Sequence, residues 1–177
     1  MIEIRRIALA DAGPLAAQIR ASRAHLEPWE PVRDESFFTE AGQRQHIADV
    51  LAQDNQLPHV IVEDGRVVGR INLANVVRGP FLSANLGYWV AADAIGRGVA
   101  GTAVAALARA AFTEYGLHRI EAATLLHNIR SQRVLERNGF ERFGMAPRYL
   151  RIAGEWQDHY LFQLLAENWL AAHPSDA

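Results

Sequence analysis

The chain has 177 residues, a formal net charge of −2 at pH 7, and a composition that is 50% hydrophobic and 21% charged. That length predicts one domain over residues 1–177, and the balance is typical of a globular protein with its own core. Cysteine and lysine are both missing, which excludes disulfides, thiolate metal sites, a cysteine nucleophile, a Schiff-base lysine and a P-loop. The small net charge gives no reason to expect nucleic acid or a membrane surface as a partner.

The residues from Met1 to Ile7 alternate between apolar and charged types, unlike a signal peptide. No run approaches the roughly 20 apolar residues of a membrane span, so we expect a cytoplasmic protein. The seven histidines form no helical i, i+4 pair of the kind that binds zinc, and we therefore expect no metal.

Apolar periodicity predicts strands and helices along the whole chain. In chain order they are strand 2–7, helix 14–25, helix 36–53, strands 59–63 and 66–73 joined by a turn at 64–65, strand 85–90, a helix that opens at 96–98 and ends near 116, strand 119–125, helix 129–137, and strands 143–152 and 156–164. The tail after Trp169 is expected to fray. The order β-α-α-β-β-β-α-β-α-β-β predicts an α+β domain on a mixed sheet, with a ligand site between Leu86 and Phe140 where helices begin beside strand ends.

A glycine-rich loop, Ile95 to Thr102, leads into the helix that follows strand 85–90. Glycine lets the backbone approach a ligand closely, and the unpaired N–H groups and dipole of a helix N-terminus favour an anion such as a pyrophosphate. Gly96, Gly98 and Gly101 also match the dinucleotide fingerprint, but that fingerprint belongs to chains of β-α-β units, which the predicted order is not. A tight strand-to-helix turn is the structural alternative.

The segment from Ile95 to Ala100 resembles the acetyl-CoA-binding loop of the GNAT superfamily of N-acetyltransferases, Gln/Arg-x-x-Gly-x-Gly/Ala. Gly98 and Ala100 match this pattern, and Ile95 replaces its polar residue. Over essentially the whole chain, further segments resemble the RimJ/RimL branch, the ribosomal-protein-alanine N-acetyltransferases. They are His25-Leu26-Glu27-Pro28-Trp29, Leu86-Gly87-Tyr88-Trp89, Asn128-Ile129-Arg130-Ser131, Asn138-Gly139-Phe140 and Gly154-Glu155-Trp156-Gln157-Asp158-His159.

This resemblance implies a GNAT-like acyl-CoA N-acyltransferase fold, with a mixed sheet of about seven strands flanked by about four helices. It also implies acetyl-CoA as the co-substrate, with backbone N–H groups near Trp89 and Val90 polarising the thioester. The expected contacts to the coenzyme are Trp89, Val90, Gly96, Arg97, Gly98, Val99, Ala100, Gly101, Thr102, Asn128, Arg130, Ser131 and Arg133. Asn128 is in addition a good helix N-cap by residue type, and the arginines also suit a solvated helix face.

Many members of the superfamily protonate the leaving thiolate with a tyrosine, whose position here is Leu135. The resemblance instead points to Ser131 as the general acid or hydrogen-bond donor. Some relatives use a glutamate as base, whose position here is Leu150, so Glu30 and Asp158 are the candidate carboxylates for holding a water relay. A free α-amine, with a pKa of about 7.7–8.0, is partly neutral near pH 7 without strong help. Residues expected to shape the acceptor site are Trp29, Glu30, Tyr88 and Tyr149.

The acceptor is expected to be the N-terminal α-amine of a ribosomal or other protein, attacking directly in a ternary complex. A small amine such as a polyamine, amino sugar or drug is the alternative, and an acidic group of Glu27, Glu30, Asp34 and Glu35 suits a polycation. A CoA-binding regulatory module without turnover is a third reading. The branch often forms dimers, so the resemblance also allows a homodimer.

Overall fold

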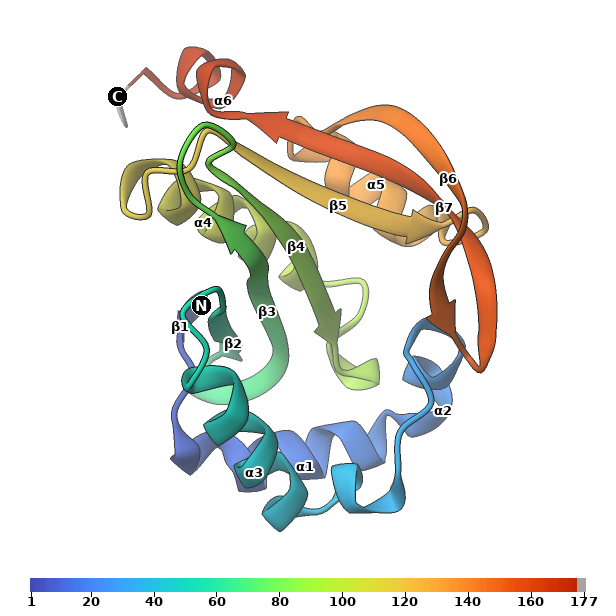
Figure 1. The fold of residues 1–177 in the computed structure, drawn as a ribbon. Coiled ribbons are helices and arrows are strands. Elements are labelled where there is room, and N and C mark those ends of the chain that lie inside the picture. Colours follow the sequence, from blue (N-terminus) through green and yellow to red (C-terminus); the bar gives the residue numbers. More distant parts are fainter. Residues whose placement is uncertain (175–177) are drawn as a thin grey trace.

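The computed structural model describes residues 1–174 and is built on one sheet of seven strands in the order β1-β2-β3-β4-β5-β7-β6 (Figure 1). Neighbouring strands are antiparallel except β4 and β5, which are parallel. The elements are β1 Ile2–Arg6, α1 Ala12–Ala21, α2 Arg23–Leu26, α3 Glu40–Leu51, β2 Leu57–Glu63, β3 Arg66–Val77, β4 Ser83–Val90, α4 Val99–Thr113, β5 Arg119–Leu125, α5 Ile129–Arg137, β6 Glu141–Ile152, β7 Glu155–Leu165 and α6 Ala166–Ala172. Short 3-10 turns, η2 at Glu27–Trp29 and η3 at Glu35–Phe38, lie between α2 and α3.

The expected mixed sheet and the order of its elements are confirmed, and the bounds predicted for 119–125 and 129–137 are those of β5 and α5. The helix predicted over 14–25 is interrupted at Ser22, whose side chain accepts a hydrogen bond from the N–H of Ala92 at 2.9 Å. The helix predicted from Ser36 begins at Glu40 instead, because the Thr39 side chain caps it by accepting from the N–H of Gly42.

The prediction that the tail frays after Trp169 is wrong for residues 170–172, which are the end of helix α6. Helix α6 forms there because Trp169, only 5% exposed, packs its ring against Phe112 and stacks on His173. Residues 175–177 of the predicted tail lie outside the described residues. Within residues 1–174, α2 and α6 are additional to the four helices expected.

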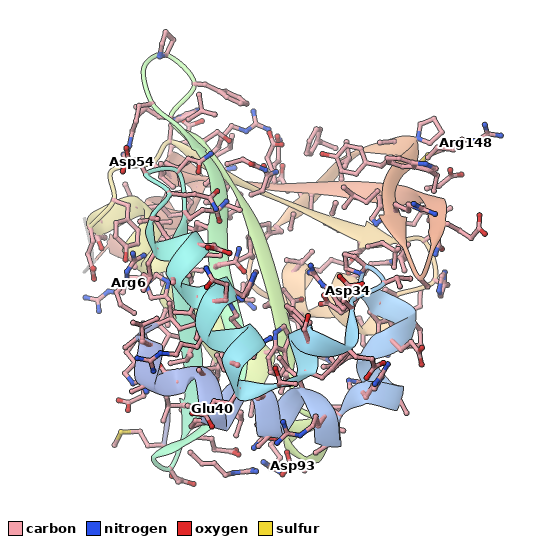
Figure 2. The ribbon with its side chains drawn as sticks, turned by 60° about the horizontal axis from the view of Figure 1, so that its bottom comes forward. Arg6, Asp34, Glu40, Asp54, Asp93 and Arg148 are labelled. Atoms are coloured by element: carbon pink, nitrogen blue, oxygen red, sulfur yellow. The ribbon has the colours of Figure 1, made fainter. Side chains whose placement is uncertain are left out.

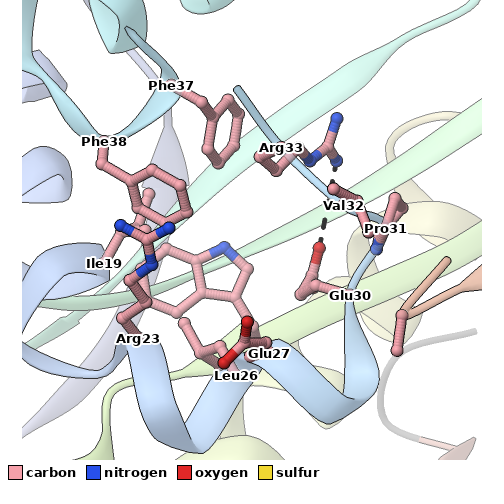
Figure 3. A pocket seen from close by; sticks show the side chains of 12 residues that line it. Ile19, Arg23, Leu26, Glu27, Glu30, Pro31, Val32, Arg33, Phe37 and Phe38 are labelled. Carbon is pink, nitrogen blue, oxygen red and sulfur yellow. Dashed lines mark ion pairs between the residues drawn. The ribbon is translucent and has the colours of Figure 1, made fainter. Parts of the chain in front are cut away.

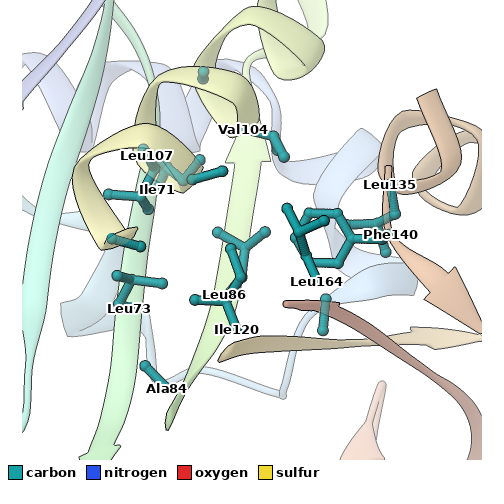
Figure 4. Packing of buried hydrophobic residues seen from close by; sticks show 14 of the residues in the cluster. Ile71, Leu73, Ala84, Leu86, Val104, Leu107, Ile120, Leu135, Phe140 and Leu164 are labelled. Carbon is teal, nitrogen blue, oxygen red and sulfur yellow. The ribbon is translucent and has the colours of Figure 1, made fainter. Parts of the chain in front are cut away.

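Helices cover the two faces of the sheet separately. Helices α4 and α5 pack on one face, where Leu107 of α4 and Leu135 of α5 are fully buried with Ile71 and Leu86 of the sheet (Figure 4). Each such side chain contributes roughly 1.5–3 kcal/mol through burial. Helices α1 and α3 pack on the opposite face, in a second cluster that includes Leu15, Ile47, Val60 and Val67.

The sheet divides in its middle. Strands β4 and β5 pair only through Ser83–Asn85 and Arg119–Glu121, and beyond these three pairs they diverge (Figure 1). Residues 86–90 of β4 therefore have β3 as a partner on one side and no strand on the side toward β5. We call this divergence the sheet split. At the split, the end of β4 can be reached from both faces of the sheet.

Candidate active site

The end of β4 presents backbone donors to the sheet split. The N–H of Ala91 donates to the carbonyl of Val68 at 2.8 Å, so residues 91 and 89 direct their backbone groups toward β3. Donors alternate along a strand, and the N–H groups of Tyr88 and Val90 therefore face the split. Preorganised N–H groups of this kind stabilise the negative charge that develops on a thioester oxygen under attack.

The glycine loop forms the N-terminus of α4. Gly96 and Gly98 have φ of +81° and +80°, and a Cβ at either position would meet no atom within 4 Å. Gly98 is the N-cap of α4 and no side chain caps that helix, so its first N–H groups remain available to an anion. The backbone N–H groups of Val99, Ala100 and Gly101 thus suit a phosphate cradle, whereas the N–H of Thr102, also predicted to contact the coenzyme, already donates to the carbonyl of Gly98 at 3.0 Å. The side chain of Val99 is buried in the core.

The first turn of α5 places the hydroxyl of Ser131 against the hydroxyl of Tyr88 on β4. Asn128 is the N-cap, as its residue type predicts, and its Oδ1 accepts from the N–H of Ser131 at 3.2 Å. The Oγ of Ser131 lies 2.8 Å from the phenolic oxygen of Tyr88. Burial raises the pKa of Tyr88 to about 12 against the opposing effect of the Ser131 hydrogen bond, so Tyr88 stays protonated at neutral pH.

A cavity of about 380 Å³ opens on the face that carries α1 and α3 (Figure 3). Its size suits a small molecule or the first residues of a peptide. Trp89 of β4, the aromatic pair Phe37 and Phe38 of η3, and Ala153 at the tip of the β6–β7 hairpin all contribute to its lining. The remaining lining residues are Ile19, Arg23, Leu26, Glu27, Glu30, Pro31, Val32 and Arg33.

Glu30 is held at this cavity by its own backbone, because its carbonyl accepts from the N–H of Ala153 at 3.0 Å. The loop that carries it, 30–34, therefore lies between the helices and the β6–β7 hairpin (Figure 2, where Asp34 marks the loop). Burial raises the pKa of the Glu30 carboxyl, and the positive charges of Arg33 and Arg70 oppose the rise. Arg33 is 3.9 Å away, a loose ion pair (Figure 3).

Other residues predicted for the acceptor site take different places. The ring of Trp29 lies 5.3 Å from that of His127, which joins η2 to the loop before α5. Tyr149 is 41% exposed on β6 and lies outside the cavity lining. Asp158 also lies outside that lining, and its Oδ1 accepts from the N–H of Arg148 at 2.8 Å, which stabilises a bulge in β6.

Of the arginines predicted to meet the coenzyme, Arg130 and Arg133 are exposed on α5. Arg97, in the glycine loop, directs its guanidinium to the carboxylate of Glu63, with Nε at 3.1 Å from Oε1, and to the carbonyl of Asp93. The side chain of Arg97 is therefore engaged within the protein, and only its backbone is left to contact a ligand.

Sequence reasoning missed Arg70, Phe37, Phe38 and His127. The alternating pattern of β3 predicts which residues share a face, but not that an arginine would stand on a face covered by helices. The apolar spacing of Phe37, Ala41 and Ile47 predicts one long helix, whereas Phe37 and Phe38 form a separate turn before Thr39, which caps α3.

Within residues 1–174, no three His, Asp or Glu side chains are grouped so as to hold a metal ion. None of the helices described there is long and apolar enough to cross a membrane.

Comparison with known proteins gives consistent matches. Residues 2–141 match the family model described as an acetyltransferase (GNAT) domain. The [ribosomal protein uS5]-alanine N-acetyltransferase of Escherichia coli is 35% identical over 164 residues, 90% of this chain and 84% of that protein. The structure of Mycobacterium smegmatis RimJ in complex with CoA-disulfide has a TM-score of 0.90 and 33% identity, covering 98% of this chain and 89% of that one.

The ribosomal-protein-S5-alanine acetyltransferase of Vibrio fischeri has a TM-score of 0.87 and 32% identity, over 95% of this chain and 94% of that one. The matching family model spans most of the chain, and these relatives match it nearly from end to end in both sequence and fold. The chain therefore belongs to the GNAT family of N-acetyltransferases, in its RimJ/RimL branch.

Proposed function

We propose that this enzyme transfers the acetyl group of acetyl-CoA to the N-terminal α-amine of a protein, a ribosomal protein being the first candidate. The observation that carries the proposal is the convergence at the end of β4. The N–H of Val90 and the Ser131–Tyr88 pair lie at the sheet split, and the cavity with Glu30 opens beside Trp89. Relatives named for alanine N-acetylation of ribosomal proteins support this choice of acceptor.

Coenzyme and acceptor would approach this point from opposite faces of the sheet. Cross-strand partners share a face, so Tyr88 belongs with Ile71 to the face of α4 and α5, and Trp89 belongs with Arg70 to the face of α1 and α3. The pyrophosphate would lie on the glycine loop at α4, with the thioester in the split. Holding both reactants in one geometry supplies several kcal/mol of the acceleration.

The reaction forms a bond from the amine nitrogen to the thioester carbon and breaks the carbon–sulfur bond. The N–H of Val90 stabilises the oxyanion, and the Glu30 carboxylate takes the surplus amine proton directly or through a water. A serine hydroxyl is too weak an acid to protonate a thiolate whose pKa is near 8.5, so Ser131 donates a hydrogen bond to the leaving sulfur. Overall, one proton moves from the amine to the sulfur by way of solvent.

The charge balance of the cavity argues against a polycationic acceptor. Of the acidic group noted in the sequence, Glu35 pairs with Arg23 at 2.6 Å and Glu30 faces Arg33. The cavity lining holds Arg23 and Arg33 against Glu27 and Glu30, so the two signs cancel. A polyamine would gain no net attraction there, whereas a single peptide α-amine needs only one carboxylate.

The pH profile of a Glu30→Gln variant tests the base. We expect kcat/KM to fall about 10²-fold at pH 6.5, since general base catalysis typically contributes 10²–10⁴-fold. The loss should shrink toward pH 9, because the amine there deprotonates without help. A matched Glu27→Gln variant, changed in the same lining, should keep the wild-type profile. A Glu30→Gln profile parallel to wild type at every pH would remove Glu30 as the base.

The same variant has a stability signature that is independent of turnover. A carboxyl whose folded-state pKa is raised contributes its full stability below its unfolded-state pKa, and loses it as pH rises through the folded-state value. Glu30→Gln should therefore raise Tm at pH 7 relative to wild type and leave it unchanged near pH 4, as measured by calorimetry.

Thiol release from acetyl-CoA, with peptides and small amines as acceptors, tests the function itself. We expect acetylation of peptides that begin with Ala or Ser, located on the α-amine by mass spectrometry. Acetylation of small amines alone, or of lysine side chains alone, would contradict the proposal.

A further inference from the structure

Arg70 stands in the middle of the face that α1 and α3 cover. Its cross-strand partners are Val60 on one side, fully buried, and Trp89 on the other, which lines the cavity. An arginine between two apolar neighbours on a helix-covered face departs from the pattern of the rest of this face, which is apolar at Leu15, Ile47 and Val67. Such a departure needs a physical reason.

No carboxylate in the described part of the chain pairs directly with this charge. The Nε of Arg70 is shut off from solvent without a hydrogen-bond partner, and within residues 1–174 no carboxylate oxygen lies within 4 Å of its guanidinium. The charge of Arg33 acts on it more strongly than that of Glu30, and burial is the main cause that lowers the pKa of Arg70, to about 10. Two guanidinium groups thus share one loosely held carboxylate.

His46 adds no negative charge and no competing partner. It is kept neutral because burial, and then the charges of Arg70 and Arg33, lower its pKa to about 4. Arg70 is half-buried. Withdrawing an unpaired charge from water destabilises the fold, and functional sites are where proteins keep such a cost. The unpaired guanidinium therefore indicates a missing anion on this face of the sheet.

The coenzyme is a poor source for that anion. Its phosphates would lie at the N-terminus of α4, and α4 packs on the opposite face from Arg70. Arg70 is not itself among the residues that line the cavity, but its cross-strand partner Trp89 and the neighbouring charge Arg33 are. The proposed acceptor would therefore enter on the face that carries Arg70.

We propose that Arg70, with Arg33 beside it, binds a carboxylate of the acceptor, so that preferred acceptors carry an acidic group close to the amine that is acetylated. This rests on the proposed function and narrows its substrate class. The carboxylate would come from an acidic side chain near the N-terminus of a peptide or from the α-carboxylate of a dipeptide, because both present the same two oxygens to a guanidinium.

Matched acceptors test the proposal. The set is hexapeptide amides that begin with Ala and carry Glu at position 2, 3 or 4, the same peptides with Gln, and the dipeptides Ala-Ala and Ala-Ala amide. We expect one Glu register to exceed its Gln counterpart in kcat/KM by about 10- to 100-fold, as for a hydrogen bond to a charged group. If only the dipeptide Ala-Ala is preferred over its amide, the carboxylate bound by Arg70 is the α-carboxylate of a small acceptor. Equal values for every Glu/Gln and acid/amide pair would overturn the proposal while leaving the acetyltransferase activity intact.

Arg70→Gln should reduce the Glu/Gln ratio to near one. The charge of Arg70 also acts on the pKa of Glu30, but this effect is the same for both peptides and cancels in the ratio. Arg66→Gln is the matched control on the same strand, because Arg66 pairs with Asp93 at the surface. Arg70→Lys keeps the charge and loses the planar guanidinium, so its ratio of kcat/KM for the Glu and Gln peptides should lie between those of wild type and Arg70→Gln. This variant replaces Arg70→Gln in the test if the latter does not fold. A loss of acetyl-CoA affinity in Arg70→Gln, with the ratio unchanged, would overturn the proposal by assigning the anion to the coenzyme.

Calorimetric titration of peptide into the CoA-bound protein separates the two proposals. Binding of the Glu peptide that depends on Arg70, without acetylation of any acceptor, would sustain the anion site and refute the proposed function. Equal binding of Glu and Gln peptides would refute the anion site whatever the turnover.

Discussion

A Ser131→Ala variant should show a kcat lowered by about 10- to 100-fold and a KM for acetyl-CoA within about twofold of wild type. The reason is local: the variant loses only the hydroxyl that we propose stabilises the leaving thiolate, through a hydrogen bond to a charged group. The Asn128 cap on α5 survives, because it accepts from the backbone N–H of residue 131 and not from its side chain. Thiol release under saturating acetyl-CoA measures the effect, and an unchanged kcat would discard the role.

Tyr88→Phe provides the matched comparison, because it removes the partner of Ser131 and keeps the ring in place. Either hydroxyl can be the donor of this hydrogen bond. When Tyr88 donates to the Ser131 Oγ, the serine hydrogen is free to point at the sulfur. We expect kcat to fall about 3- to 10-fold, as for one neutral hydrogen bond. If Tyr88 acts only through Ser131, Tyr88→Phe should add nothing further in the Ser131→Ala background.

The second large effect is expected at Gly69, where β3 approaches β4 closely. A Cβ at this position would lie 2.4 Å from the carbonyl oxygen of Trp89 and 3.2 Å from the Cα of Val90. Gly69→Ala must therefore displace the backbone that carries the Val90 N–H. We expect Tm to fall by roughly 3–10 °C, from a cost of about 1–3 kcal/mol. We also expect kcat to fall about 10²-fold, because the proposed oxyanion donor moves.

Gly87→Ala is the control on the neighbouring strand. A Cβ there would meet only the Oδ1 of Asn72, at 3.8 Å, which is ordinary contact. We expect a stability change within about 0.5 kcal/mol. Equal Tm shifts in the two variants would show that close approach at Gly69 is not what constrains the strand pair.

The order of elements was predictable because each strand and helix carries its own apolar period and its own turn residues. Asp64 and Gly65, for example, form the hairpin turn with positive φ at both positions, as their types predict. Helix ends were harder: Thr39, and not Ser36, caps α3, since both types cap well and only tertiary packing decides. Trp169 shows the same limit, because its burial against Phe112 depends on contacts distant in sequence.

The positions of the glycine loop at the start of α4 and of Ser131 at the start of α5 were predictable, because the motif residues lie close together in the chain. The cavity proposed for the acceptor was not, since its lining comes from α1, α2, η2, the 30–33 loop, η3, β4 and the β6–β7 hairpin. Arg70 and the Glu30–Ala153 contact depend on which strand faces meet, information that no local window contains.

The three-pair junction between β4 and β5 has a consequence for folding and dynamics. Strands β1–β4 and β5–β7 each form an antiparallel ladder of their own, and only residues 83–85 and 119–121 join the two ladders directly. The amides of Tyr88 and Val90, which lack a strand partner, should exchange with deuterium faster than those of Trp89 and Ala91 in the free protein. A bound coenzyme would act as the missing strand between the two ladders. Saturation with coenzyme should therefore slow the exchange of these two amides, and the two ladders should then unfold in a single, more cooperative transition.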